Sequence, residues 1–294
     1  MYLQVLHFRE FLNFFHIQLY LRENGYAVIE NFLTESQIND LKLAGKGFID
    51  EAVESCQRSI FSSGHSQNSP QASDRYFLDS CDKISFFYET NAFNDNGDFQ
   101  VDPEISLNKV GHALHRLNPV FTEITNHQKV KDVCRQLNLK KPSIIQSMYI
   151  YKNPKTGGEV KPHQDASYLH TEPPSLYGFW IALDDATEEN GCLWFIPGSH
   201  KEEEVLYRFV RNSDKTSENL CVYRGLNPLY EETDFVITPA KSGTCIIIHG
   251  NVVHRSFHNH SNKPRHAYTF HVYDSAISKY SEENWLQTNF ISLY

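Results

Sequence analysis

Short apolar stretches that alternate with turn-forming glycine, proline and asparagine run through the chain from residue 143 to residue 273. The spacing of these stretches leaves little room for helices between them. Many short strands separated by turns are typical of a β-barrel or a double-sheet jelly roll, whereas a doubly wound α/β fold needs a helix after each strand. The predicted strands are residues 144–151, 178–183, 192–196, 236–237, 244–248 and 267–273.

The sequence pattern before residue 143 is different, and we predict that this part of the chain is mostly helical. Thr34 and Gln37 fit a capping box that begins a helix, with Ile38, Leu41 and Phe48 on one side of it. A long loop rich in serine, glutamine and asparagine is typical of a functional lid or of disorder. The other expected elements are an aromatic-rich amphipathic helix within 1–22, a strand at 26–29, this loop at 56–75, and helices at 105–118 and 128–138.

These patterns together predict a mainly β chain of the α+β class, with N-terminal helices packed on a C-terminal jelly roll. No repeat and no charged tail divides the chain, so we expect a single domain covering residues 1–294. Within that domain the expected parts are a mostly helical part with the lid loop at 1–142, the β core at about 143–275, and a C-terminal segment at 276–294.

Composition narrows the classes of function. Hydrophobic residues make up 40% of the chain, which is typical of a globular protein. The net charge of −9, with dispersed acidic residues, argues against binding to nucleic acid or to an anionic membrane. Six scattered cysteines without a CxxC motif predict free thiols. No apolar run approaches a membrane span or a signal peptide, so we expect a cytoplasmic protein, monomeric by default.

The stretch His163-Gln164-Asp165 is the most informative motif. In an extended backbone, residues i and i+2 point to the same side, so His163 and Asp165 can reach a common ion. His254 arrives much later in the chain as a candidate third ligand. Two imidazoles and one carboxylate on one face are typical of non-haem iron(II), and this arrangement leaves open positions for other ligands. By itself such a motif is weak, because the chain has 15 histidines and most histidines are not ligands.

Arg265 strengthens the prediction of a site at this motif. It follows His254 by 11 residues, after a turn-like stretch at 259–264. A hairpin of that length would place the guanidinium near the metal, where it could bind a carboxylate through two hydrogen bonds. The simpler alternative is an arginine at a strand end that forms an ordinary ion pair.

Several stretches together resemble the phytanoyl-CoA dioxygenase family. The matching stretches are residues 108–115, 146–150, 162–167, 191–200 and 283–287, and the resemblance extends from about residue 24 to the C-terminus. It implies a double-stranded β-helix of the jelly-roll or cupin type. It also implies an iron(II)- and 2-oxoglutarate-dependent oxygenase, which uses O₂ and in some cases ascorbate as a reductant.

The resemblance implies roles for individual residues. His163, Asp165 and His254 match the iron ligands and hence the catalytic centre of the family. Arg265 matches the residue that binds the distal carboxylate of 2-oxoglutarate, and Ser256 lies where the family assists it. The positions that match the remaining lining of the co-substrate pocket are Lys109, Met148 and Trp180. Each of these three also has a simpler interpretation, as a solvated lysine on a helix face or as core packing.

The expected reaction converts 2-oxoglutarate to succinate and CO₂ while hydroxylating a small-molecule substrate, with lipid or acyl compounds as one candidate class. Two alternatives stay open. A zinc hydrolase can use two histidines and a carboxylate, although such a site has no need for Arg265. A non-catalytic protein could bind the metal and 2-oxoglutarate without turnover.

Overall fold

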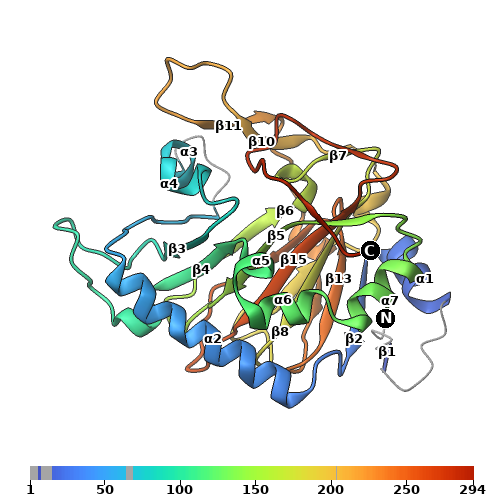
Figure 1. Ribbon diagram of the computed structural model, residues 1–294, viewed down its shortest axis with the longest axis horizontal. Coiled ribbons are helices and arrows are strands. Elements are labelled where there is room, and N and C mark those ends of the chain that lie inside the picture. Colours follow the sequence, from blue (N-terminus) through green and yellow to red (C-terminus); the bar gives the residue numbers. More distant parts are fainter. Residues whose placement is uncertain (1–5, 8–14, 64–68, 203) are drawn as a thin grey trace.

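Two sheets organise the chain, and the larger of them crosses the middle of Figure 1. The computed structural model describes residues 6–7, 15–63, 69–202 and 204–294. Its large sheet has nine strands, and every neighbouring pair is antiparallel except β1 with β2. In spatial order the strands are β1 (Leu6–His7), β2 (Tyr26–Glu30), β13 (Cys245–His249), β8 (Leu176–Ala182), β15 (Ala267–Asp274), β5 (Pro142–Ile150), β4 (Leu107–His112) and β3 (Ile84–Tyr88), with β17 (Ile291–Ser292) pairing with β5.

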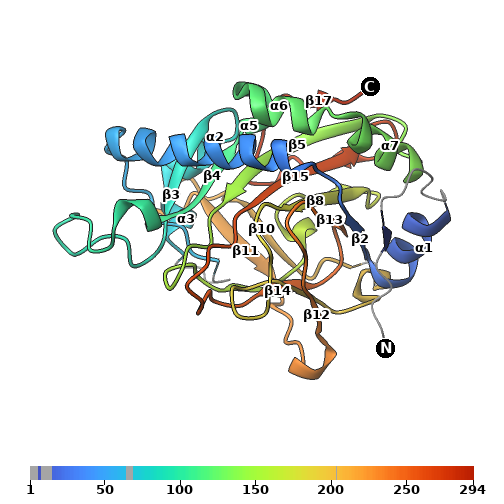
Figure 2. The same ribbon diagram turned by 90° about the horizontal axis from the view of Figure 1, so that it is seen from below.

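The small sheet has four antiparallel strands and lies below the large sheet in Figure 2. Its order is β12 (Val236–Thr238), β9 (Leu193–Phe195), β14 (His254–Ser256) and β6 (Val160–His163). Two facing antiparallel sheets with crossover connections form a double-stranded β-helix, so the expected jelly-roll core is confirmed. Two further strand pairs are β10 (Tyr207–Arg211) with β11 (Cys221–Gly225), and β7 (Thr171–Glu172) with β16 (Lys279–Tyr280).

Helices cover the outer face of the large sheet, so the molecule has three layers, as Figure 2 shows. Phe48 of α2 and Phe121 of α6 stack at a centroid distance of 5.8 Å and pack in the same core as the sheet. The helices are α1 (Phe15–Asn24), α2 (Glu35–Glu54), α3 (Pro70–Ser73), α4 (Arg75–Leu78), α5 (Leu114–Leu117), α6 (Pro119–Thr125) and α7 (Gln128–Gln136). Single 3₁₀ turns are formed by Pro103–Ile105, Asp165–Ser167, Ser199–Lys201 and Glu232–Asp234.

The central strands are apolar on both faces because both faces are covered. In β8, Phe179 and Ile181 pack in the core beneath the helices, while Trp180 and Ala182 pack in the core between the two sheets. A strand with two buried faces reads as an unbroken apolar run rather than as an alternation of apolar and polar residues. This pattern is why the central strands were visible in the sequence.

The predicted helix at residues 105–118 is wrong. Leu107–His112 forms β4, which pairs with both β3 and β5, and only Leu114–Leu117 is helical. Val110 is fully buried in the core beneath the helices, while the neighbouring Lys109 lines the cavity on the other face of the sheet. Pairing on both edges stabilises the strand, and a single apolar stretch of this length does not separate strand from helix in the sequence.

Two other expectations in the N-terminal part need correction. Leu6–His7 is a strand rather than part of a helix over 1–22, helix α1 covers only Phe15–Asn24, and residues 8–14 lie outside the described residues. The expected loop at 56–75 contains the short helix α3, which begins at Pro70. The part of this loop at 64–68 lies outside the described residues.

The predicted capping box, the strand at 26–29 and the helix at 128–138 are confirmed. Thr34 accepts a hydrogen bond from the backbone of Gln37, and the Gln37 side chain accepts one from the backbone of Thr34, as a capping box requires. Strand β2 and helix α7 lie where the pattern placed them. None of the six cysteines forms a disulfide.

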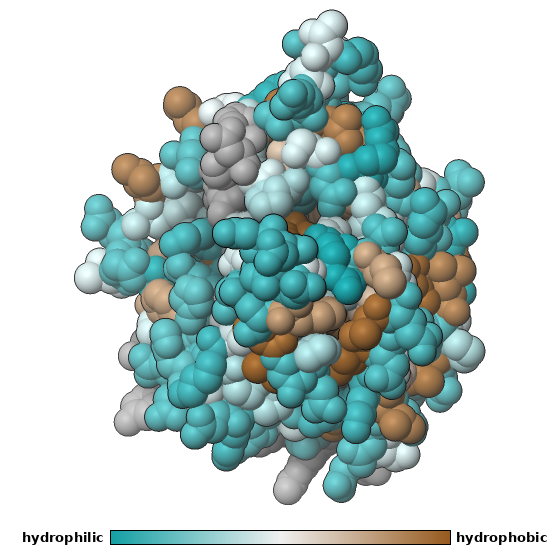
Figure 3. Space-filling model, turned by 90° about the vertical axis from the view of Figure 1, so that its left-hand side faces the viewer, coloured by the Kyte–Doolittle hydropathy of each residue, from teal (hydrophilic) through white to brown (hydrophobic). Residues whose placement is uncertain are grey.

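The surface is mainly hydrophilic on the side shown in Figure 3, with hydrophobic residues gathered near the middle of that face. Among the described residues, no helix is both long enough and apolar enough to cross a membrane.

Candidate active site

A cavity opens between the two sheets, and each residue that the sequence singled out for the site lies on its wall. The large sheet contributes side chains from β4, β5, β8 and β15, and the small sheet contributes side chains from β6, β9 and β14. The predicted residues on the wall are Lys109, Met148, His163, Asp165, Trp180, His254, Ser256 and Arg265.

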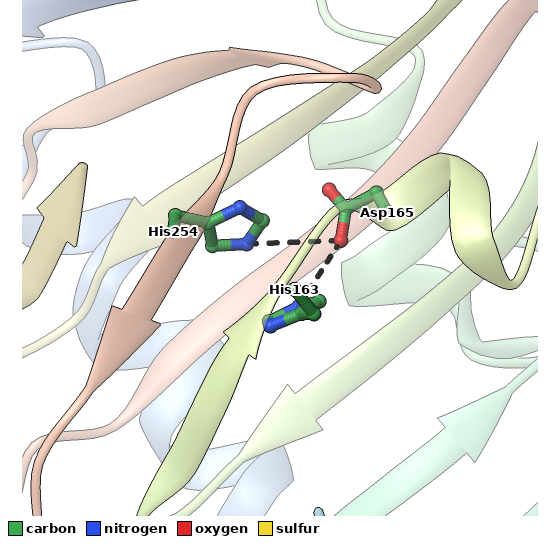
Figure 4. Close-up of side chains that lie close together, drawn as sticks. All are labelled: His163, Asp165 and His254. Atoms are coloured by element: carbon green, nitrogen blue, oxygen red, sulfur yellow. Dashed lines mark ion pairs between the residues drawn. The ribbon is translucent and has the colours of Figure 1, made fainter. Parts of the chain in front are cut away.

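His163, Asp165 and His254 converge from two strands and a turn (Figure 4). His163 ends β6 and lies directly opposite His254 of β14 in the antiparallel ladder. The distance to Asp165 Oδ1 is 3.5 Å from His163 Nε2 and 3.7 Å from His254 Nε2. The three candidate ligand atoms lie within 4.8 Å of one another, so they are placed to hold one ion.

The route by which Asp165 reaches this cluster differs from the prediction. The alternation of side chains along a strand was expected to bring His163 and Asp165 to the same side, but β6 ends at His163 and Asp165 begins a 3₁₀ turn. The backbone of that turn is held by a hydrogen bond from Ala166 N–H to the carbonyl of Gly250. The predicted convergence is therefore present, although a turn rather than an extended strand produces it.

The two imidazoles present their Nε2 atoms to the shared position. Nδ1 of His163 donates to the carbonyl of Lys161 at 2.8 Å, and Nδ1 of His254 donates to the carbonyl of Val252 at 3.2 Å. A proton on Nδ1 leaves the lone pair on Nε2, which is the form that binds a metal. Burial lowers the pKa of His254 to about 4, so its imidazole is neutral at physiological pH.

His271 of β15 also belongs to this cluster, and the sequence reasoning missed it. Its Nε2 lies 3.1 Å from Asp165 Oδ2, the carboxylate oxygen that faces away from the other two histidines. Burial alone would raise the pKa of Asp165, but the neighbouring His271 and His254 and two hydrogen bonds hold it well below its usual value. The signal for His271 was its position two residues after Thr269, on the cavity side of a predicted strand.

Gly178 of β8 makes room for the contact between Asp165 and His271. A Cβ atom at Gly178 would lie 3.2 Å from Asp165 Oδ2 and 3.4 Å from His271 Nε2. Both distances are shorter than or at the limit of ordinary packing, so a larger residue would push the carboxylate toward the other ligands. This is the place in the site where glycine is needed for close approach.

Arg265 is a buried residue of the cavity wall, and only 2% of its surface is exposed. Its Nε donates to the carbonyl of Gly191 at 3.1 Å, and one terminal nitrogen lies 3.5 Å from Ser256 Oγ. The other terminal nitrogen has no hydrogen-bond partner among the described residues. Burial lowers the pKa of Arg265 to about 10, so the guanidinium stays charged at neutral pH. The simpler interpretation of Arg265 was an ordinary ion pair at a strand end. Arg265 forms no such ion pair with another described residue.

The other co-substrate positions suggested by the resemblance lie on the large sheet. The ring centroid of Trp180 is 5.4 Å from the Arg265 guanidinium carbon. Met148 of β5 is paired with Thr269 of β15, and both side chains line the cavity. Trp180 is also 96% buried in the core between the sheets, so it both packs in that core and lines the cavity.

Lys109 is a buried residue of a strand, so its interpretation as a solvated lysine on a helix face is wrong. Its Nζ lies 3.3 Å from the ring centroid of Phe61 and 5.7 Å from those of Phe77 and Phe87. Burial lowers the pKa of Lys109 to about 7, while the ring faces favour its charged form. A second buried lysine, Lys152, donates to the carbonyls of Gly158 and Phe257 and so ties the cavity wall together.

Comparison with known proteins agrees with this geometry. The family model described as phytanoyl-CoA dioxygenase (PhyH) matches residues 21–267. A protein of Arabidopsis thaliana named phytanoyl-CoA dioxygenase is 43% identical over 276 residues, which cover 94% of this chain and 92% of that relative. Phytanoyl-CoA dioxygenase domain-containing protein 1 of Danio rerio is 44% identical and covers 93% of this chain and 96% of that relative.

Solved structures share the fold at low sequence identity. The non-heme alpha-ketoglutarate-dependent carbocyclase SnoK has a TM-score of 0.59 at 18% identity and covers 94% of this chain and 95% of that chain. The epimerase SnoN, in complex with Fe3+, alpha-ketoglutarate and nogalamycin RO, has a TM-score of 0.61 at 15% identity, covering 96% and 98%. The fold and the enzyme class expected from the sequence, a dioxygenase, are confirmed, and the chain belongs to the phytanoyl-CoA dioxygenase family.

Proposed function

We propose that this chain is an iron(II)- and 2-oxoglutarate-dependent hydroxylase of a small molecule. The observation that carries the proposal is the presence of two features in one cavity: the cluster of His163, Asp165 and His254, and a buried, charged Arg265 with one terminal nitrogen that has no partner among the described residues. A metal cluster alone suits several reactions. A buried guanidinium whose described partners are all neutral favours an anion in the same cavity, and a dicarboxylate co-substrate supplies one.

The donor atoms present fit iron(II). Two imidazole nitrogens and one carboxylate oxygen would hold the ion, and each imidazole is already oriented by a carbonyl behind it. His271 engages the second oxygen of Asp165 and so favours binding through Oδ1 alone. Iron(II), when bound, would supply the activation of O₂ that couples oxidation of the substrate to decarboxylation of 2-oxoglutarate.

The remaining predicted residues would hold 2-oxoglutarate. Arg265 would pair with the distal carboxylate, with Ser256 as its hydrogen-bonding neighbour. Lys109 would add a second positive charge in its protonated form, so that a dianion meets two buried cations. Trp180 and Met148 would form apolar walls that limit the orientations of the carbon chain.

We further infer that residues 1–294 act as one domain. Strand β2 and strands β3 and β4 come from the N-terminal part, yet they extend the sheet formed by the core strands. Lys109 reaches the cavity from that N-terminal part, so the proposed site needs both halves of the chain. A monomer and a cytoplasmic location stay predictions from the sequence.

The test is formation of succinate from 2-oxoglutarate under air by iron-loaded protein, compared with an Asp165→Ala variant. Wild-type protein is expected to form succinate slowly in the absence of a prime substrate, and the variant is expected to form none above background. Asp185→Ala is the matched control, because that carboxylate is half exposed and pairs with Lys241 at the surface. Equal activity with zinc in place of iron, or equal activity in the Asp165 variant, would contradict the proposal.

A further inference from the structure

The cavity has a second part that the proposed co-substrate site does not use. Phe77, Phe209 and Trp285 line this part and belong to a hydrophobic cluster separate from the one that contains Trp180. Phe77 stacks on Trp285 with a centroid distance of 4.3 Å. Two polar side chains, His112 and Gln146, interrupt this apolar wall. We call these five residues the aromatic part of the cavity.

His112 presents a lone pair in the aromatic part. The hydroxyl of Ser80 donates to the carbonyl of Phe77 at 2.6 Å, so its oxygen is left to accept from His112 Nδ1 at 2.8 Å. A proton on Nδ1 leaves Nε2 as an acceptor. Nε2 has no hydrogen-bond partner among the described residues, and His112 is fully buried. Burial, together with the charges of Lys109 and His271, keeps the pKa of His112 well below its usual value, so the ring is neutral.

Gln146 presents a second acceptor. His271 Nε2 lies 3.1 Å from a carboxylate oxygen of Asp165, and it must be the donor in that contact. His271 Nδ1 lies 3.4 Å from the amide nitrogen of Gln146. The amide nitrogen is thus engaged with His271, while the amide oxygen Oε1 has no partner among the described residues. Gln146 is 94% buried.

Both acceptors lie near the metal cluster. Gln146 is linked through His271 to the ligand Asp165, and His112 is close enough to His271 for the two rings to interact electrostatically. A buried acceptor that stays unpaired is destabilising, so two of them on one wall indicate a partner that enters the cavity. The ammonium group of Lys109 is held over the Phe61 ring rather than against either acceptor.

We propose that the prime substrate carries an uncharged hydrogen-bond donor, a hydroxyl or N–H group, which binds to His112 Nε2 and Gln146 Oε1, with an apolar portion against the aromatic part of the cavity. This inference rests on the proposed function for its meaning as a substrate site. Lone-pair acceptors pair with a donor and not with a carboxylate or phosphate, so an anionic group is disfavoured at these two atoms. A buried acceptor rejects an analogue that lacks the donor more strongly than an apolar wall rejects a change in shape.

The test compares benzyl alcohol, benzyl methyl ether and benzoate as probes of the aromatic part. Their dissociation constants are measured by ligand-observed NMR on the full chain, with manganese(II) and 2-oxoglutarate present and again without either. Benzyl alcohol is expected to bind about tenfold more tightly than the ether, because only the alcohol pairs with a buried acceptor. Benzoate is expected to bind more weakly than the alcohol. Equal binding of alcohol and ether would mean that solvent satisfies both acceptors, and it would overturn the inference.

Variants of the two acceptor residues show which side chains cause the preference for alcohol over ether. Gln146→Leu and His112→Phe each remove one acceptor, and each is expected to reduce the preference for alcohol over ether to about threefold or less. Gln136→Leu is the matched control, because Gln136 Oε1 is also buried with no partner in the part of the chain that the structure describes, but Gln136 lies on α7 and not on the cavity wall. The control should keep the wild-type preference. A preference that survives in both cavity variants would also overturn the inference. If a cavity variant fails to fold, the comparison of probes on wild-type protein still decides.

The outcome is separable from that of the proposed function, because binding of the probes needs no turnover. A tenfold preference in a protein that forms no succinate would support the donor site and contradict the oxygenase. Succinate formation without any preference between alcohol and ether would support the oxygenase and contradict the donor site.

Discussion

The two parts of the cavity differ in how they are built. The part around Arg265, Ser256 and Trp180 is built from core strands β14 and β8 and from the loop before β15, and its polar groups are mostly partnered or charged. The rings of the aromatic part come from segments outside the two sheets, with Phe77 in α4, Phe209 in β10 and Trp285 after β16, whereas its polar residues His112 and Gln146 belong to β4 and β5 of the large sheet. Its polar atoms, on His112 and Gln146, are neutral acceptors without partners among the described residues. In the proposed substrate site, the added segments therefore contribute the apolar wall, while the large sheet contributes the hydrogen-bonding atoms.

The largest effect should come from removing the charge at the core part. Arg265→Leu is expected to raise the KM for 2-oxoglutarate by about a hundredfold, because truncating one partner of a buried charge pair leaves the carboxylate without a counter-ion. The measurement is the dependence of succinate formation on 2-oxoglutarate concentration. The affinity of benzyl alcohol for the aromatic part should stay within about twofold of wild type. A change in both would mean that the two parts do not act separately.

Arg255→Lys is the matched control for that variant. Arg255 is a second buried arginine on the cavity wall, but its guanidinium forms two hydrogen bonds with Glu232 and is therefore already neutralised. A lysine keeps the ion pair with Glu232. The KM of the Arg255→Lys variant for 2-oxoglutarate should stay close to that of wild type. A large increase would mean that any arginine on the cavity wall affects 2-oxoglutarate binding, whether or not its charge is already paired.

His271 joins the two parts, and its replacement should have the next largest effect. His271→Leu is expected to weaken iron(II) binding by about ten- to hundredfold, because Asp165 loses the donor that orients its second oxygen. His271→Gln keeps an N–H donor and should recover most of the affinity. Anaerobic titration with iron(II) measures both variants. Equal losses in the two variants, with unchanged thermal stability, would show that the ring's shape rather than its hydrogen bond is what Asp165 needs.

Part of this site could be predicted from the sequence, and the reason is physical. His163, Asp165, His254 and Arg265 were recognisable because a motif that is weak by itself stands together with a distal histidine, an arginine 11 residues later and several stretches that resemble one family. The prediction that these residues converge did not depend on the exact secondary structure, because Asp165 reaches the cluster from a turn rather than from a strand. The core strands were visible because burial on two faces produces unbroken apolar runs.

The rest could not be predicted because it depends on tertiary pairing. Leu107–His112 has no pattern that separates a strand from a helix, and its pairing with β3 and β5 decides the outcome. His271 gains its role from a contact with Asp165 across the cavity, which no local pattern records. The acceptor at Gln146 follows in turn from His271, so it becomes visible only when the hydrogen bonds are traced in three dimensions.

A smaller effect should appear as a pH dependence of 2-oxoglutarate binding. Burial lowers the pKa of Lys109 to about 7, and binding of an anion favours its protonated form. Affinity should therefore be complete below this pKa and fall as the pH rises through it, by about fivefold between pH 7 and pH 8. Calorimetric titration at a series of pH values measures the slope. Lys109→Met should bind more weakly and show a flat profile over the same range. A sloping profile in this variant would assign the titration to another group.

The smallest effects should come from two tryptophans, one in each part of the cavity. Trp180→Phe removes apolar contact beside Arg265 and is expected to raise the KM for 2-oxoglutarate by about two- to threefold. Trp285→Phe reduces the stacking on Phe77 and should instead weaken benzyl alcohol by a similar factor. Each variant should leave the value for the other ligand unchanged within error, because the two rings belong to separate hydrophobic clusters. If Trp285→Phe also changed the KM for 2-oxoglutarate, the two clusters would be mechanically coupled, and an added segment would then influence the chemistry as well as the selectivity.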